Sequence, residues 1–148
     1  MDHYHIGYIM GVFDLFHVGH LNLIRRAKEH CDYLRVGILT DELVLEQKGK
    51  MPFIPLEERM AIMASMRYVD EVVAVEDGLL SKVAEWYRRP FDCLFSGSDY
   101  EGNPIWEIEK RELEKLGSTI EFFPYTQTTN STKIRALIER ELHDRRNI

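Results

Sequence analysis

The sequence predicts an α/β protein in which a five-stranded parallel sheet carries helices on both faces. Apolar runs of strand length alternate five times with stretches of helical period along the chain. The 148 residues suffice for one domain with a full core and fall short of two ordinary domains. Hydrophobic residues make up 45% and charged residues 30%, as in ordinary globular proteins. We therefore expect residues 1–148 to form a single domain.

The first elements follow from apolar spacing. Residues 6–10 read as a strand that ends at Gly11, where a glycine lets the chain turn sharply. A helix is expected at residues 19–30, whose apolar residues share one helix face. Residues 33–39 are apolar enough for a second strand. A polar loop is then expected from residue 40 to residue 54.

The middle elements start at a proline. Pro55 suits a first helical position, and glutamates follow it in the first turn, so a helix is expected from there to residue 66. A third strand is expected at residues 71–75 and a helix at residues 79–87. A short fourth strand is expected at residues 93–96.

The last elements end near the final residue. A helix at residues 105–116 stops at Gly117, which is a good helix terminator. A fifth strand is expected at residues 119–123 and a final helix at residues 131–142. In parallel sheets of this kind, ligands bind outside the carboxyl ends of the strands. We therefore expect the functional site at the carboxyl ends of the strands.

Charge and cysteine content exclude several classes of protein. The net charge of -6 gives no basic face for duplex nucleic acid. The N-terminus lacks the features of a signal peptide, and no apolar run approaches the roughly 20 residues of a membrane helix. Cys31 and Cys93 lie in apolar surroundings outside any Cys-x-x-Cys pair, so we expect buried free thiols. From the free thiols and the lack of signal-peptide features we expect a cytoplasmic protein.

The strongest functional signal lies directly after the first strand, in Gly11-Val12-Phe13-Asp14-Leu15-Phe16-His17-Val18-Gly19-His20. His17 and His20 are three residues apart and share one face at the start of a helix. Helix N-termini suit phosphate, and each imidazole can donate a hydrogen bond to a phosphate oxygen. Purely structural histidines are one alternative. A metal site is another, although Cys31, the nearest further ligand, lies about a full helix away.

This segment resembles the HxGH motif of the cytidylyltransferase-like nucleotidyltransferases, and the resemblance extends over nearly the whole chain. It is closest to the glycerol-3-phosphate cytidylyltransferases. The resemblance rests on further segments of this sequence: Thr40-Asp41-Glu42, Glu58-Arg59, Arg67-Tyr68-Val69-Asp70-Glu71-Val72 and Ser131-Thr132-Lys133-Ile134. It implies a Rossmann-like nucleotidyltransferase fold and transfer of CMP from CTP to a phosphorylated polyol, with release of pyrophosphate, in teichoic acid or capsule precursor synthesis.

The resemblance also implies which residues bind the nucleotide. They are Gly11, Val12, Phe13, Asp14, His17, Gly19, His20, Asp99, Tyr125, Thr126, Asn130, Ser131 and Thr132. Some of these depart from the family pattern. Val12 stands where threonine is common, and Tyr125, Thr128 and Asn130 replace an arginine, a glycine and a serine. Loss of that arginine removes a positive charge and a bidentate phosphate contact.

Basic residues are implied for the substrate site. Lys48 is expected to act in catalysis together with the two histidines, and Lys50 is its rival because one inserted residue blurs the alignment. Arg67 and Lys82 are further candidates for binding the acceptor. Arg59 can serve equally in binding or in a structural ion pair.

The resemblance implies Mg²⁺ carried with the triphosphate, CTP and a phosphorylated small molecule as ligands, and a homodimer. No metal ligands are assigned to the protein itself. Three alternatives remain open at this stage: an adenylyltransferase that uses ATP, a catalytically silent nucleotide-binding module, and a metal-binding regulatory domain.

Overall fold

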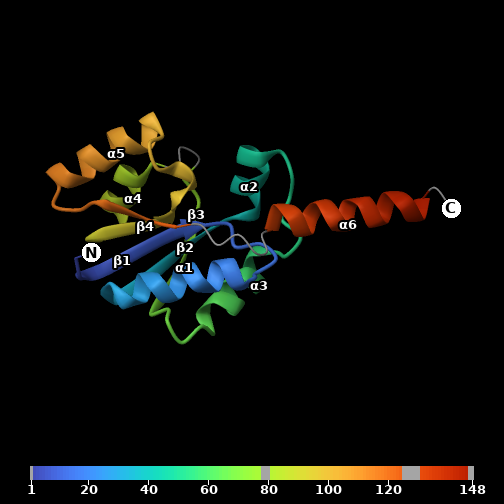
Figure 1. Ribbon diagram of the computed structural model, residues 1–148, viewed down its shortest axis with the longest axis horizontal. Helices are drawn as coiled ribbons and strands as arrows, with labels where there is room; N and C mark the ends of the chain where they lie inside the picture. Colours follow the sequence, from blue (N-terminus) through green and yellow to red (C-terminus); the bar gives the residue numbers. More distant parts are fainter. Residues whose placement is uncertain (1, 78–80, 125–130, 147–148) are drawn as a thin grey trace.

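The computed structural model describes residues 2–77, 81–124 and 131–146 (Figure 1). Within these residues, five parallel strands form one sheet in the order β3-β2-β1-β4-β5. The strands are β1 (Tyr4–Gly11), β2 (Cys31–Leu39), β3 (Glu71–Val75), β4 (Cys93–Gly97) and β5 (Ile120–Phe123). The predicted five-stranded parallel sheet is confirmed.

Helices cover both faces of this sheet, as predicted. The described helices are α1 (Val18–Glu29), α2 (Asp41–Lys48), α3 (Leu56–Ala64), α4 (Lys82–Arg88), α5 (Pro104–Lys115) and α6 (Ser131–Arg146), with a 3-10 turn η1 (Ser98–Tyr100). Figure 1 shows α1 and α3 on one face and α4 and α5 on the other. Helix α6 projects away from the sheet at its carboxyl edge.

Alternation along the strands builds a separate core on each face. On the α1 side, Ile9 and Phe95 pack against Ile24 of α1. On the α5 side, Tyr8 and Leu94, each the neighbour of one of those strand residues, pack with Leu113 of α5. Because both faces are buried, the strands read in sequence as nearly continuous apolar runs.

The prediction of a polar loop at residues 40–54 is wrong, because the first half of this segment forms helix α2. The helix is capped at both ends. The Thr40 side chain accepts a hydrogen bond from the Leu43 backbone N–H at 3.2 Å, and Gly49 ends the helix in the left-handed conformation with φ of 73°. With only Leu43 and Val44 buried, the helix has too little apolar periodicity for sequence spacing to reveal it.

Several predicted boundaries also move. Pro55 is the N-cap of α3 and not its first helical residue, and α3 ends at Ala64, before the predicted residue 66. Strands β1 and β2 each begin two residues earlier than predicted, and α6 runs four residues further. Residues 79–80 of the predicted fourth helix lie outside the described residues, and α4 begins at Lys82 behind the N-cap Ser81.

Among the described residues, no helix has both the length and the hydropathy needed to cross a bilayer. The predicted free cysteines are confirmed, since Cys31 and Cys93 are both buried thiols. Burial raises the pKa of Cys31 to about 11, and the same cause raises the pKa of Cys93. Both thiols are therefore protonated and inert at neutral pH.

Candidate functional site

A cavity of about 570 Å³ opens at the carboxyl edge of the sheet, where the strand order reverses between β1 and β4. Ligands of doubly wound sheets bind at this switch point. The cavity extends over both faces of the sheet. The α1 side is lined by residues that include His17, His20, Asn22, Leu23, Arg26 and Phe123, and the α5 side by residues that include Val12, Val44, Lys82, Tyr100 and Trp106.

The two histidines form a preorganised pair at the start of α1. The rings of His17 and His20 are stacked with centroids 3.9 Å apart. His17 is the N-cap, and its Nδ1 accepts a hydrogen bond from the Gly19 backbone N–H at 3.0 Å. The Nδ1 of His20 accepts a hydrogen bond from the His17 backbone N–H at 3.3 Å. Because both Nδ1 atoms are acceptors, the neutral tautomer of each ring carries its proton on Nε2.

Burial keeps both rings neutral. It lowers the pKa of His17, and it lowers the pKa of His20 to about 4 with a smaller contribution from the positive charge of a neighbouring protonated His17. Asp14 opposes this shift of His20 only in part. At neutral pH the pair thus offers two Nε2–H donors, held in place by backbone hydrogen bonds, in a cavity that a phosphate can enter.

The pKa of His20 predicts how stability depends on pH. Between pH 6.5 and pH 4, the unfolded chain binds a proton at this ring that the folded chain does not bind. The free energy of unfolding is therefore expected to fall as the pH drops through this interval, and the contribution of His20 is complete above pH 6.5. Urea unfolding across the interval measures the slope. His20→Gln should flatten it, and an unchanged slope in that variant would contradict the assignment.

Positive side chains surround the cavity. Lys48, Lys50, Lys82, Arg26 and Arg135 all line it. The ammonium of the buried Lys82 lies 3.2 Å from Glu109 Oε2 and 3.8 Å from the centre of the Trp106 ring. The Lys50 ammonium lies 3.2 Å from Glu139 Oε1 of α6 in an exposed ion pair. An ion pair as exposed as this one contributes little to stability, so it leaves that lysine available to a stronger anion.

Asp14 connects the histidine loop to two other segments. This buried carboxylate accepts hydrogen bonds from the backbone N–H groups of Phe53 and Ile54 at 2.8 and 3.0 Å. It also pairs with Arg135 of α6 at 2.7 Å, whose guanidinium lies 4.1 Å from the centre of the Phe53 ring. Arg135 thereby brings a guanidinium to the cavity in a chain whose Tyr125 replaces the family arginine.

Arg59 has a structural position. Its side chain is fully buried and donates to the backbone carbonyls of Ile54, Val12 and Leu39 and to Asp41 Oδ1, at 2.6 to 2.9 Å. Of the two roles considered for Arg59, the structure favours the ion pair. Because Val12 lines the cavity and Leu39 precedes α2, this one side chain fixes the loop after β1 and the end of β2.

The structure brings most of the sequence-predicted residues together. The predicted residues that line the cavity are Gly11, Val12, Phe13, Asp14, His17, Gly19, His20, Lys48, Lys50, Lys82, Asp99 and Thr132. Arg67 does not. Its exposed guanidinium contacts the neighbouring Tyr68, with Nη2 2.8 Å from the phenol oxygen. Tyr125, Thr126 and Asn130 lie outside the described residues, and Ser131 is the first residue of α6.

Several lining residues were missed by the sequence reasoning. Arg135 follows Thr132 by three residues and so shares its helix face, which is a signal that spacing could have provided. Asn22 and Arg26 lie in the body of α1, and Arg26 contacts Phe123 of the distant strand β5 at the cavity. Trp106 of α5 also lines the cavity.

Among residues 2–77, 81–124 and 131–146, no group of three or more His, Cys, Asp or Glu side chains is arranged to hold a metal ion. A site built from His17, His20 and Cys31 therefore finds no support in the described structure. The Cys31 thiol instead lies 3.3 Å from the Ala27 carbonyl, at the far end of α1 from the histidines.

Comparison with known proteins identifies relatives. A family model described as cytidylyltransferase-like matches residues 8–137. The chain is 35% identical over 132 residues to an FAD synthase of Pyrococcus horikoshii, covering 88% of this chain and 87% of that protein. It is 37% identical over 125 residues to a glycerol-3-phosphate cytidylyltransferase of Bacillus subtilis, covering 84% and 90%.

The fold has solved counterparts. A lipopolysaccharide core biosynthesis protein of Thermoplasma volcanium superposes with a TM-score of 0.67 at 22% identity, covering 85% of this chain and 99% of that one. At this identity the likeness concerns the fold alone.

Proposed function

The chain belongs to the cytidylyltransferase-like family and is a nucleotidyltransferase, and we propose that it transfers CMP from CTP to a phosphorylated small polyol such as glycerol 3-phosphate. The observation that carries the proposal is the pair of Nε2–H donors that His17 and His20 hold at the switch point of the sheet. Similarity to the Bacillus subtilis glycerol-3-phosphate cytidylyltransferase supports the choice of nucleotide and acceptor.

In the proposed reaction, a phosphate oxygen of the acceptor attacks the α-phosphorus of CTP. A new P–O bond forms on one side while the bond to the β-phosphate breaks on the other, and pyrophosphate leaves without a covalent enzyme intermediate. Such transfers depend mainly on positioning and on stabilising charge. The Nε2–H donors of His17 and His20 would bind the oxygens on which negative charge develops.

The two reactants are assigned to different sides of the cavity. We assign the nucleotide to the α1 side of the cavity, next to the histidines, and the acceptor to the α5 side. Lys48 at the end of α2, Lys50 two residues further, and Lys82 on α4 supply positive charge at the cavity for the two anionic reactants. Mg²⁺ entering with the triphosphate would neutralise part of its charge. Since the described residues form no metal cluster, none of them is assigned to hold this ion.

A second candidate is adenylyl transfer from ATP. Similarity to the Pyrococcus horikoshii FAD synthase over most of both chains favours it. In that case the acceptor would be a larger aromatic phosphate, and the exposed Tyr100, stacked on Trp106 with ring centroids 4.5 Å apart, would offer it an aromatic surface.

One experiment separates these candidates. Pyrophosphate release is measured with CTP or ATP, each paired with glycerol 3-phosphate, phosphoethanolamine or FMN. We expect turnover with CTP and glycerol 3-phosphate. Turnover with ATP and FMN alone would replace the proposal with the second candidate, and no turnover with any pair would support a silent nucleotide-binding module.

Two further properties belong to the proposal. The family resemblance supports a homodimer, which sedimentation of the purified protein would test. The two free, buried thiols support a reducing compartment such as the cytoplasm.

A further inference from the structure

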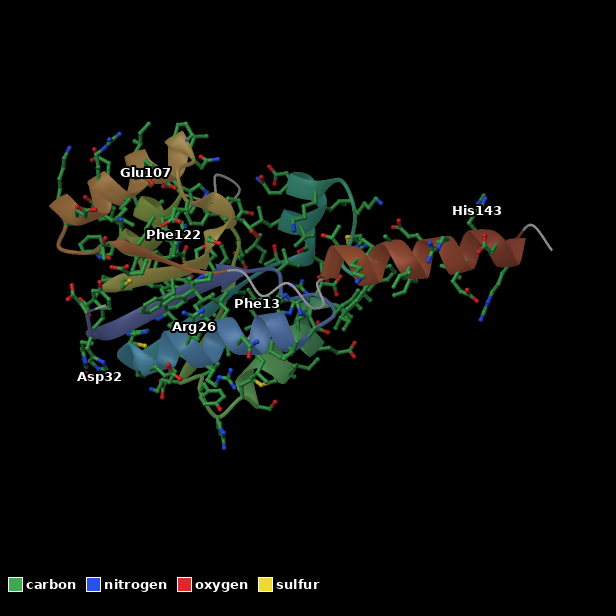
Figure 2. The ribbon with its side chains drawn as sticks, in the orientation of Figure 1. Phe13, Arg26, Asp32, Glu107, Phe122 and His143 are labelled. Atoms are coloured by element: carbon green, nitrogen blue, oxygen red, sulfur yellow. The ribbon has the colours of Figure 1, made fainter. Side chains whose placement is uncertain are left out.

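One face of α1 continues from the histidines along the cavity, and it carries two polar side chains that the transfer reaction does not use, those of Asn22 and Arg26. Gly19, Asn22, Leu23 and Arg26 recur at the three- and four-residue spacing of a single helix face, and all four line the cavity. Figure 2 shows Arg26 on the side of the sheet that α1 covers and Phe122 on the opposite side. The row therefore extends the histidine site along the α1 side, away from the acceptor half.

Arg26 is oriented by stacking. Its guanidinium carbon lies 4.9 Å from the centre of the Phe123 ring. The Phe123 ring is itself stacked on Phe95, with centroids 5.5 Å apart and planes 8° from parallel. A guanidinium held against an aromatic ring keeps its five N–H donors in a fixed plane. Within the described part of the chain, no carboxylate or carbonyl is paired with these donors, unlike those of Arg59 and Arg135.

Asn22 adds a second donor to the same wall. Its amide oxygen accepts a hydrogen bond from Arg25 Nη2 at 2.9 Å, so the NH₂ group is the part that remains for a ligand. The wall between α1 and β5 thus combines fixed donors with apolar surface from Leu23 and Phe123. This combination matches a flat, neutral ring whose edge carries adjacent hydrogen-bond acceptors.

The position along α1 fits a nucleotide held by the histidines. Arg26 follows His20 by six residues, which corresponds to about 9 Å along a helix. In a nucleotide, a ribose separates the α-phosphate from the base by a similar span. With the α-phosphate at His17 and His20, the base therefore reaches Arg26.

We infer that Arg26 selects the base of the nucleotide by donating both arms of its guanidinium to the O2 and N3 acceptors of cytosine. This inference rests on the proposed function. Adenine presents an amino group beside its N1 acceptor, and uracil presents an N–H at N3. Each of these bases would therefore place a hydrogen-bond donor against an N–H of the Arg26 guanidinium. A mismatched donor in a water-excluded site costs more than a missing contact. Arg26 is thus a specificity-determining residue.

The test compares Arg26→Met and Arg26→Lys with the wild-type protein. Binding of CTP, UTP, ATP and inorganic tripolyphosphate is measured by calorimetry, and CTP turnover is recorded alongside. A bidentate arginine–base contact is worth about tenfold to a hundredfold in discrimination. We expect both variants to lose CTP affinity by about that factor while tripolyphosphate binding is nearly unchanged. The lysine variant keeps the charge but not the planar fork, so it should not rescue CTP binding.

Arg111→Met is the matched control, because Arg111 is exposed on α5 and does not line the cavity. Thermal melting confirms that each variant is folded. Equal loss of CTP and tripolyphosphate binding in Arg26→Met would assign the side chain to phosphate and overturn the inference. A wild-type preference for CTP that persists in Arg26→Met would overturn the inference alone. A wild-type protein that prefers ATP and does not turn over CTP would overturn the proposed function as well.

Discussion

Replacing either His17 or His20 with alanine is expected to lower kcat by about 100- to 1000-fold, as removal of one preorganised donor does at other sites that stabilise developing negative charge. The fixed tautomers are the reason. Each ring receives a backbone N–H on Nδ1 and keeps its Nε2–H for the ligand, so no reorganisation is needed when charge builds on the phosphate. Single-turnover rates with saturating nucleotide give the effect on the chemical step.

Variants can separate this role from a structural one. His17 also caps α1, so its loss costs about 0.5 to 2 kcal/mol of stability, and melting must be measured with activity. Glutamine places an amide N–H₂ near the position of Nε2, so His20→Gln should retain more activity than His20→Ala. His143→Ala, at the exposed end of α6 far from the cavity, is the control (Figure 2). Full activity in His17→Ala and His20→Ala would refute the proposed role of the pair.

Arg59→Met is expected to lower the free energy of unfolding by about 3 to 5 kcal/mol, the usual cost of breaking a buried ion pair by removing one partner. The change leaves three backbone carbonyls without their donor and deprives Asp41 of its charge partner. A loss of this size is a large part of the stability of a small domain. Urea unfolding measures it as a lower midpoint at unchanged slope.

The conservative and control variants sharpen this expectation. Arg59→Lys keeps the charge, but its single ammonium cannot donate to all four acceptors as the planar guanidinium does. The lysine variant should therefore recover only part of the lost free energy of unfolding. Arg111→Met removes an exposed arginine and should leave the midpoint nearly unchanged. A destabilisation of Arg59→Met no larger than that of Arg111→Met would show that the buried network contributes little.

Sequence reasoning predicted the sheet because both of its faces are buried, which makes every strand a visible apolar run. It missed α2 because that helix depends on its caps and on only two buried residues, Leu43 and Val44. The histidine pair was predictable because its residues are close in sequence. Arg26 was not, because its ring partner Phe123 lies on a distant strand. Arg67 was carried over from the family pattern, and the structure places it outside the cavity.

The position of the cavity across the edge of the sheet has a consequence for how such a protein changes over evolutionary time. The side chains of α1 and those of α4 and α5 belong to separate cores on opposite faces of the sheet, and both sides contribute lining residues to the cavity at the strand ends. Under the proposed division of the cavity, substitutions on the α5 side change the acceptor and substitutions on the α1 side change the donor nucleotide, each without disturbing the other core. Independent change on the two sides offers a physical reason why relatives that align over most of their length carry names as different as FAD synthase and glycerol-3-phosphate cytidylyltransferase.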